Sequence, residues 1–62
     1  MDTFVVIWSP EGRVMEAVEA KDRGEAISKV LSLTKYKKYR KFRGEVYAEL
    51  QSVWERRTKG KD

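Results

Sequence analysis

The hydrophobic pattern of the first twenty residues predicts a β-hairpin. Residues 3–9 contain a β-branched and aromatic run that is apolar on both faces of a strand. Ser9-Pro10-Glu11-Gly12 then has the residue order of a type I turn, with a glycine where a hairpin bulge needs positive φ. The chain returns as a second strand over residues 13–20. Strict alternation places Val14, Glu16, Val18 and Ala20 on one face and Met15, Ala17 and Glu19 on the other. Charge on both faces favours a place at the sheet edge.

An amphipathic helix is predicted over residues 23–33. Asp22 and Glu25 have the spacing of a capping box, in which each side chain bonds a backbone N–H group near the helix start. The apolar stripe that would pack on the hairpin consists of Ala26, Ile27, Val30, Leu31 and Thr34.

Residues 45–57 fit two patterns. Val46, Leu50 and Val53 fall on one helical face, whereas Val46, Ala48 and Leu50 also alternate as in a strand. Good helix formers, and arginines in the last turn, favour the helix. The preceding basic segment either joins this helix, with Gly44 as a hinge, or forms a third strand over residues 36–42. The fold class is therefore α+β: an N-terminal β-hairpin, an amphipathic helix, and a basic segment running into a second, C-terminal helix (ββαα), or ββαβα if the basic segment is a strand.

The chain of 62 residues predicts one small domain over residues 1–58 and a frayed tail over residues 59–62. We expect Trp8 and Trp54 to dominate its thin core. Without Cys or His, neither a disulfide nor a zinc site can reinforce that core, so we expect a homodimer formed through the first strand. The apolar run at residues 4–8 is too short for a signal peptide or a membrane span. A soluble, cytoplasmic protein is the expectation.

Charge is distributed unevenly along the chain. The net charge is +4, but residues 1–34 hold four basic and six acidic residues, whereas residues 35–62 hold ten basic and four acidic ones. Every residue from 35 to 43 is basic or aromatic. A polarised molecule with a cationic C-terminal half is therefore expected.

Few catalytic chemistries are open to this composition. A chain without Cys or His has no thiolate nucleophile and no imidazole base. The carboxylates between residues 16 and 25 are explained by capping and solubility, and no calcium-binding or glycine-rich phosphate loop is present. We therefore expect neither an enzyme nor a cofactor or metal site.

The basic and aromatic segment predicts a small nucleic-acid-binding accessory or regulatory protein. Cationic side chains neutralise phosphates of DNA or RNA, and aromatic rings can stack on bases. If the segment is helical, Tyr39 and Phe42 turn inward, and Tyr36 is the aromatic residue expected to stay exposed. The candidate nucleic-acid-binding residues are Lys35, Tyr36, Lys37, Lys38, Arg40, Lys41, Arg43, Arg56 and Arg57.

A second hypothesis is a protein-interaction module that docks its basic face on an acidic protein. Electrostatic steering would serve such a partner equally well. Small inhibitors and adaptors of this style, short, charged and without Cys, are encoded by viruses and mobile elements.

The order of elements also resembles, faintly, the hybrid-binding domain at the start of some ribonucleases H, which recognises RNA–DNA duplexes. The likeness rests on Lys41-Phe42 followed by Glu45 and Ala48, and it is lost at Gln51, where that domain has an apolar residue. We assign no family on so few residues of common types.

Overall fold

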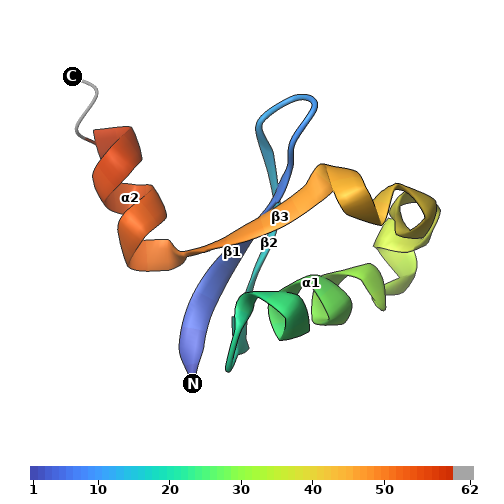
Figure 1. Ribbon diagram of the computed structural model, residues 1–62, viewed down its shortest axis with the longest axis horizontal. Helices are drawn as coiled ribbons and strands as arrows, with labels where there is room; N and C mark the ends of the chain where they lie inside the picture. Colours follow the sequence, from blue (N-terminus) through green and yellow to red (C-terminus); the bar gives the residue numbers. More distant parts are fainter. Residues whose placement is uncertain (60–62) are drawn as a thin grey trace.

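A three-stranded antiparallel sheet is the centre of the fold. The computed structural model describes residues 1–59, with side chains described up to residue 57. The order of the secondary-structure elements is β1 (Asp2–Trp8), β2 (Arg13–Ala20), α1 (Arg23–Leu31), a 3₁₀ segment (Thr34–Glu45), β3 (Val46–Leu50) and α2 (Gln51–Lys59). β1 lies between β2 and β3; α1 packs on one face of the sheet, and α2 extends beyond the end of β3 (Figure 1). The α+β class is confirmed, and residues 60–62 of the predicted tail lie outside the described residues.

The predicted hairpin and its turn are present. The Gly12 N–H donates to the Ser9 carbonyl at 3.1 Å, and Gly12 has φ of +64°, where a side chain would be strained. β2 pairs with β1 alone and forms one edge of the sheet, as its mixed charge pattern predicted.

A β-bulge in β2 changes the faces that alternation predicted. Val6 is paired with Glu16 but the next residue, Ile7, is paired with Val14, so Met15 is an extra residue. Met15 therefore points into the core and is 8% exposed, while Val14 lies on the opposite sheet face and is 39% exposed. The prediction that Val14 shares a face with the last residues of β2 is wrong, because one inserted residue reverses the alternation.

Helix α1 begins as its sequence predicts. The Asp22 carboxylate accepts from the Glu25 N–H at 2.8 Å, and the Glu25 carboxylate accepts from the Lys21 N–H at 2.8 Å. The first bond satisfies a backbone donor that the first turn leaves unpaired, and the second pairs the N–H of the residue before the cap. Ala26 and Val30 are fully buried against the sheet, and the helix ends at Leu31, two residues before the predicted end.

The single C-terminal helix predicted over residues 45–57 is wrong in its first part. Val46 and Ala48 point into the core as alternate residues of β3, which pairs with β1 from Phe4↔Leu50 to Trp8↔Val46. The reason is that β1 has hydrogen-bonding groups along both edges, and β3 supplies the partners that β2 cannot reach. The observed element order is the ββαβα alternative, but its third strand follows the basic segment instead of lying within it.

The core is built mainly from aliphatic side chains, together with Phe4 and Met15, and not from the two tryptophans. Val6, Ile7 and Val30 are the largest fully buried side chains, whereas Trp8 and Trp54 are only half-buried. A domain of this size has too little interior to enclose an indole completely. Trp8 instead packs at the rim of the core, next to the 3₁₀ segment.

Strand β3 can be tested with one buried position. Ala48 is 5% exposed in the strand but would lie outside the apolar stripe of a helix over residues 45–57. We expect Ala48→Lys to lower the free energy of unfolding by about 3 kcal/mol or more, because it buries an unpaired charge. The exposed control Ser52→Lys should change it by no more than about 0.5 kcal/mol. Urea unfolding followed by circular dichroism measures both, and equal effects would contradict the strand.

Candidate nucleic-acid interface

The basic segment forms a 3₁₀ segment whose period matches a repeat in the sequence. Residues 35–43 read Lys-Tyr-Lys, Lys-Tyr-Arg, Lys-Phe-Arg, three copies of a basic-aromatic-basic triplet. A 3₁₀ helix has three residues per turn, so each position of the triplet lines up along its own ridge. This period of three in the sequence indicates a 3₁₀ helix, whereas we expected an α-helix or a strand. The backbone departs from helical φ and ψ at Tyr36 and Phe42, where the segment kinks.

The aromatic ridge faces the sheet at one end and solvent at the other. Tyr36 and Tyr39 pack against the core, and the Tyr36 hydroxyl donates to the Met15 carbonyl and lies 3.2 Å from a Glu16 carboxylate oxygen. Phe42 is 46% exposed. The expectation that Tyr36 is the exposed aromatic residue and that Phe42 turns inward is therefore wrong, because the hairpin supplies polar partners for the tyrosine hydroxyls, whereas Phe42 has no polar group to pair.

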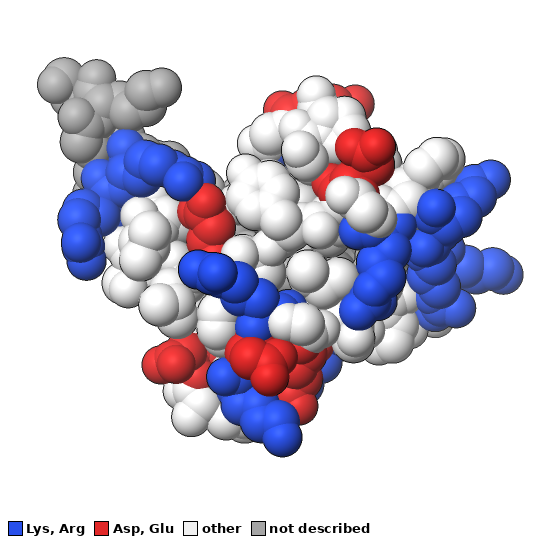
Figure 2. Space-filling view, viewed as in Figure 1, with Lys and Arg blue, Asp and Glu red and all other residues white. Residues whose placement is uncertain are grey.

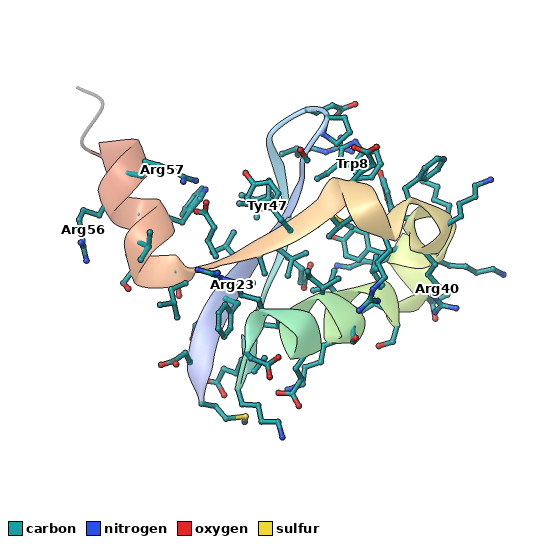
Figure 3. The ribbon with its side chains drawn as sticks, viewed as in Figure 1. Trp8, Arg23, Arg40, Tyr47, Arg56 and Arg57 are labelled. Atoms are coloured by element: carbon teal, nitrogen blue, oxygen red, sulfur yellow. The ribbon has the colours of Figure 1, made fainter. Side chains whose placement is uncertain are left out.

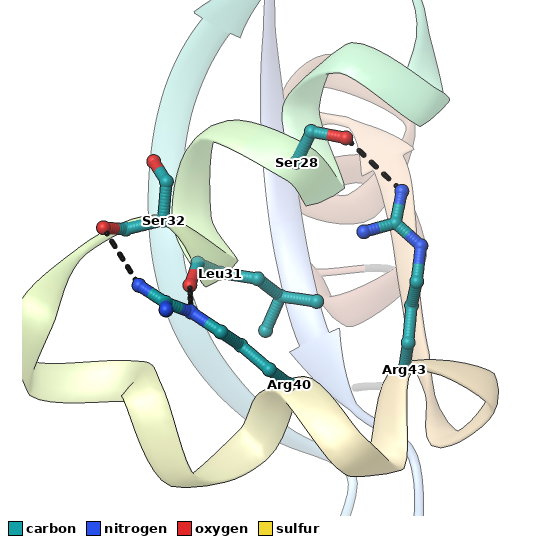
Figure 4. Close-up of a pocket in the computed structure, with 5 residues that line it drawn as sticks. All are labelled: Ser28, Leu31, Ser32, Arg40 and Arg43. Atoms are coloured by element: carbon teal, nitrogen blue, oxygen red, sulfur yellow. Dashed lines mark hydrogen bonds between the residues drawn. The ribbon is translucent and has the colours of Figure 1, made fainter.

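The second ridge carries the two arginines of the segment, and both turn toward α1. The Arg40 guanidinium donates to the carbonyls of Leu31 and Ser32 at 2.6 and 3.2 Å, and Arg43 donates to the Ser28 hydroxyl at 3.0 Å (Figure 4). Arg40 thus binds carbonyl groups that the end of a helix leaves without partners, at the negative end of its dipole. These two candidate residues hold the segment on α1.

The third ridge presents lysines to solvent. The ammonium groups of Lys35, Lys38 and Lys41 lie 5.3, 5.6 and 5.5 Å from the ring centre of the aromatic residue that follows each of them. Lys35 also lies 3.3 Å from Glu16, but among the described residues no salt bridge joins Lys38 or Lys41 to a carboxylate. Lys37, on the arginine ridge, is exposed as well. Figure 2 shows the densest group of cations over this segment.

The two candidate arginines of α2 are not part of this surface. Figure 3 places Arg56 and Arg57 at the opposite end of the long axis from Arg40. One Arg57 nitrogen lies 2.6 and 2.7 Å from the two carboxylate oxygens of Glu49 on β3. The structure therefore divides the nine sequence-predicted residues into a cluster on the 3₁₀ segment and a separate pair on α2.

Trp8 is a site residue that the sequence did not indicate. Its ring centre lies 5.0 Å from that of Tyr39 and 5.9 Å from that of Phe42, both in edge-to-face arrangements. Tyr39 in turn accepts a hydrogen bond from Arg13 of β2 at 3.1 Å. The end of β1 and the start of β2 thus meet the 3₁₀ segment at one surface that combines aromatic rings with cations.

Nowhere in residues 1–57 do three or more Asp or Glu side chains gather in a group that could hold a metal ion. None of the helices described is long and apolar enough to cross a membrane. Comparison of the chain with protein-family models, curated proteins and solved structures gave no significant match.

The hydroxyl of Tyr36 should make stability depend on pH. Burial, and then the hydrogen bond and negative charge of Glu16, raise the pKa of Tyr36 above its ordinary value of 10.0. The hydroxyl then contributes fully below pH 10, and its contribution is lost at higher pH because the unfolded chain ionises first. We expect Tyr36→Phe to cost about 1 kcal/mol at neutral pH, with a difference from the parent that shrinks above about pH 10. Urea unfolding between about pH 7 and 11 measures it, and a constant difference would contradict the raised pKa.

Proposed function

We propose that this protein binds nucleic acid through the phosphate backbone, using the lysines of the 3₁₀ segment. The observation that carries the proposal is that Lys37, Lys38 and Lys41 are exposed on one short, structurally anchored segment. Cations held at a surface displace the counterions condensed on a polyanion, and their release drives binding without sequence preference.

The spacing of the lysine ridge supports phosphate contact. A 3₁₀ helix rises about 2.0 Å per residue, so Lys38 and Lys41 are about 6 Å apart along the axis of the segment. That distance is similar to the separation of neighbouring phosphates along a nucleic-acid strand. Both residues lie between the kinks at Tyr36 and Phe42. Between them, Arg40 donates to a carbonyl group of α1 and so fixes the position of the backbone.

Fewer cations are available than the sequence count implies. Arg40 and Arg43 bond to α1, and Lys35 pairs with Glu16. Each phosphate contact contributes roughly 0.9 to the slope of log Kobs against log salt concentration for duplex DNA. Three available lysines therefore predict a slope of roughly −3, less steep than all eight basic candidate residues would give.

Charge reversal tests this proposal. We expect Lys37→Glu/Lys38→Glu/Lys41→Glu to abolish binding to labelled DNA and RNA while the far-ultraviolet spectrum and urea midpoint stay near those of the parent. The variant loses every contact assigned to phosphate and adds repulsion. Fluorescence anisotropy at low and near-physiological salt measures the affinity and the slope.

A matched control separates position from net charge. Lys21→Glu/Arg23→Glu/Arg56→Glu makes the same change in net charge, but on the loop before α1, on α1 itself and on α2. It should retain most of the affinity of the parent. Equal loss in both triple variants would mean that binding follows net charge alone, and unchanged affinity of the lysine variant would overturn the proposal.

The alternative partner, an acidic protein docked on the same lysines, predicts a different result. If the surface is specific for an acidic protein, that protein stays bound in excess DNA or RNA. If the surface is a nucleic-acid interface, the excess DNA or RNA displaces the protein. Steering by charge favours both partners, so competition is the observation that separates them.

The predicted homodimer cannot form by pairing of the first strand with its copy, because β2 and β3 occupy both edges of β1. A homodimer stays a prediction, and we place it on the sheet face opposite α1. Val14 and Tyr47 flank Ile7 on the sheet face opposite α1, and both are partly exposed. Exposed apolar groups on a sheet are a common basis for self-association. We expect sedimentation equilibrium at tens of micromolar to give a dimer mass that Tyr47→Lys reduces, and a monomer mass for the parent would contradict it.

A further inference from the structure

A groove of about 430 Å³ opens beside the lysine ridge, between the hairpin turn and the 3₁₀ segment. Its walls are the rings of Trp8, Tyr39 and Phe42. The volume lies within the range of roughly 300–1,000 Å³ that small-molecule sites occupy. The charged residues that line the groove are Glu11, Arg13, Lys38 and Lys41.

The charge around the groove is suited to an anionic ligand. Glu11 is the one acidic group among the lining residues, and it lies 3.5 Å from Arg13. That pair leaves the lysines to set the local potential. A ligand that satisfies both parts of the groove therefore has an apolar, planar body and negative charge that faces the lysines.

Phe42 has the geometry of a preformed stacking platform. Its ring is held edge-to-face by Trp8, with an angle of 70° between the planes, so Trp8 covers at most one of its faces. The Lys41 ammonium lies 5.5 Å from the ring centre, on a long side chain that can turn from the ring to a phosphate. The kink at Phe42, with φ of −108° and ψ of +29°, interrupts the regular 3₁₀ turns, and Phe42 is 46% exposed. A ring already fixed by packing loses little freedom when a ligand stacks on it.

We propose that this groove receives an unpaired base of single-stranded nucleic acid, which stacks on Phe42 while its flanking phosphates lie against Lys38 and Lys41. The inference rests on the proposed function and adds the class of polymer. A base within a duplex has both faces covered by its neighbours, so it can offer phosphates to the lysines but no face to the ring. Stacking on an aromatic side chain is tolerant of sequence because every base has a π-face.

The test compares ligands that differ in available bases; the three single strands carry the same number of phosphates, and the duplex carries twice as many. The ligands are oligothymidylate of about twelve nucleotides, oligouridylate of the same length, the matching DNA duplex, and an abasic strand with the same phosphates. The length lies within the roughly 4–16 nucleotides that single-strand-binding domains cover. We expect the parent protein to bind the two single strands more tightly than the abasic strand, and the ranking of the two distinguishes DNA from RNA.

The variants Phe42→Leu and Phe42→Trp isolate the ring. Leucine keeps an apolar side chain of similar size without a π-face, and tryptophan keeps the π-face. We expect Phe42→Leu to weaken single-strand binding by roughly 5- to 150-fold, the range measured for one stacked base, and to leave duplex and abasic binding unchanged. Phe42→Trp should retain the affinity of the parent. Val53→Ala is the matched control, because Val53 is also an exposed apolar residue but lies on α2, away from the groove. It should change no affinity.

A second readout reports the groove directly. In a Trp54→Phe background that circular dichroism shows to be folded, Trp8 is the remaining indole, so base stacking in the groove should quench its emission. Oligothymidylate should quench it and the abasic strand should not.

The two proposals fail in different ways. If Phe42→Leu binds oligothymidylate as the parent does, or loses single-strand and duplex affinity equally, the stacking inference is overturned and phosphate binding stands. If the parent binds none of the four ligands at low salt, the proposed function fails and the inference fails with it.

Discussion

The pairing of β1 along both of its edges is the constraint on which the rest of this structure depends. β1 is the central strand, with four consecutive buried residues, and the hairpin supplies a partner for only one edge. Backbone groups at the second edge need partners of their own, and β3 provides them. Once residues 46–50 are used in this way, the twelve residues of the 3₁₀ segment must connect the end of α1 to the start of β3.

The triplet repeat lets this connection serve as a structural element and as a surface. With three residues per turn, one ridge of rings packs on the sheet, a second ridge anchors on α1 through Arg40 and Arg43, and a third leaves lysines in water. An α-helix of the same sequence would turn each ridge gradually around the axis and mix these roles. The period of three therefore explains why arginines of the segment bond to α1 while neighbouring lysines face solvent.

Separation along the molecule limits what each cationic group can do. The lysines of the 3₁₀ segment share a surface with Trp8 and the hairpin turn, whereas Arg56 and Arg57 lie at the other end (Figure 3). Arg57 is bound to Glu49, which is mostly buried, and so connects α2 to β3. Net charge summed over the C-terminal half describes neither group well, because it combines cations that fix the fold with cations that face solvent.

Local signals determined the hairpin, its glycine turn, the capped helix α1 and the basic character of residues 35–43, because each depends on residues close together in the chain. The sequence also held the triplet repeat, which indicated a period of three. Tertiary structure alone decided that residues 46–50 form a strand, that Met15 is a bulge, that Arg40 binds α1, and that Trp8 meets Phe42. These outcomes depend on hydrogen bonds and packing between distant residues, and such contacts override a local preference for helix or for strict alternation.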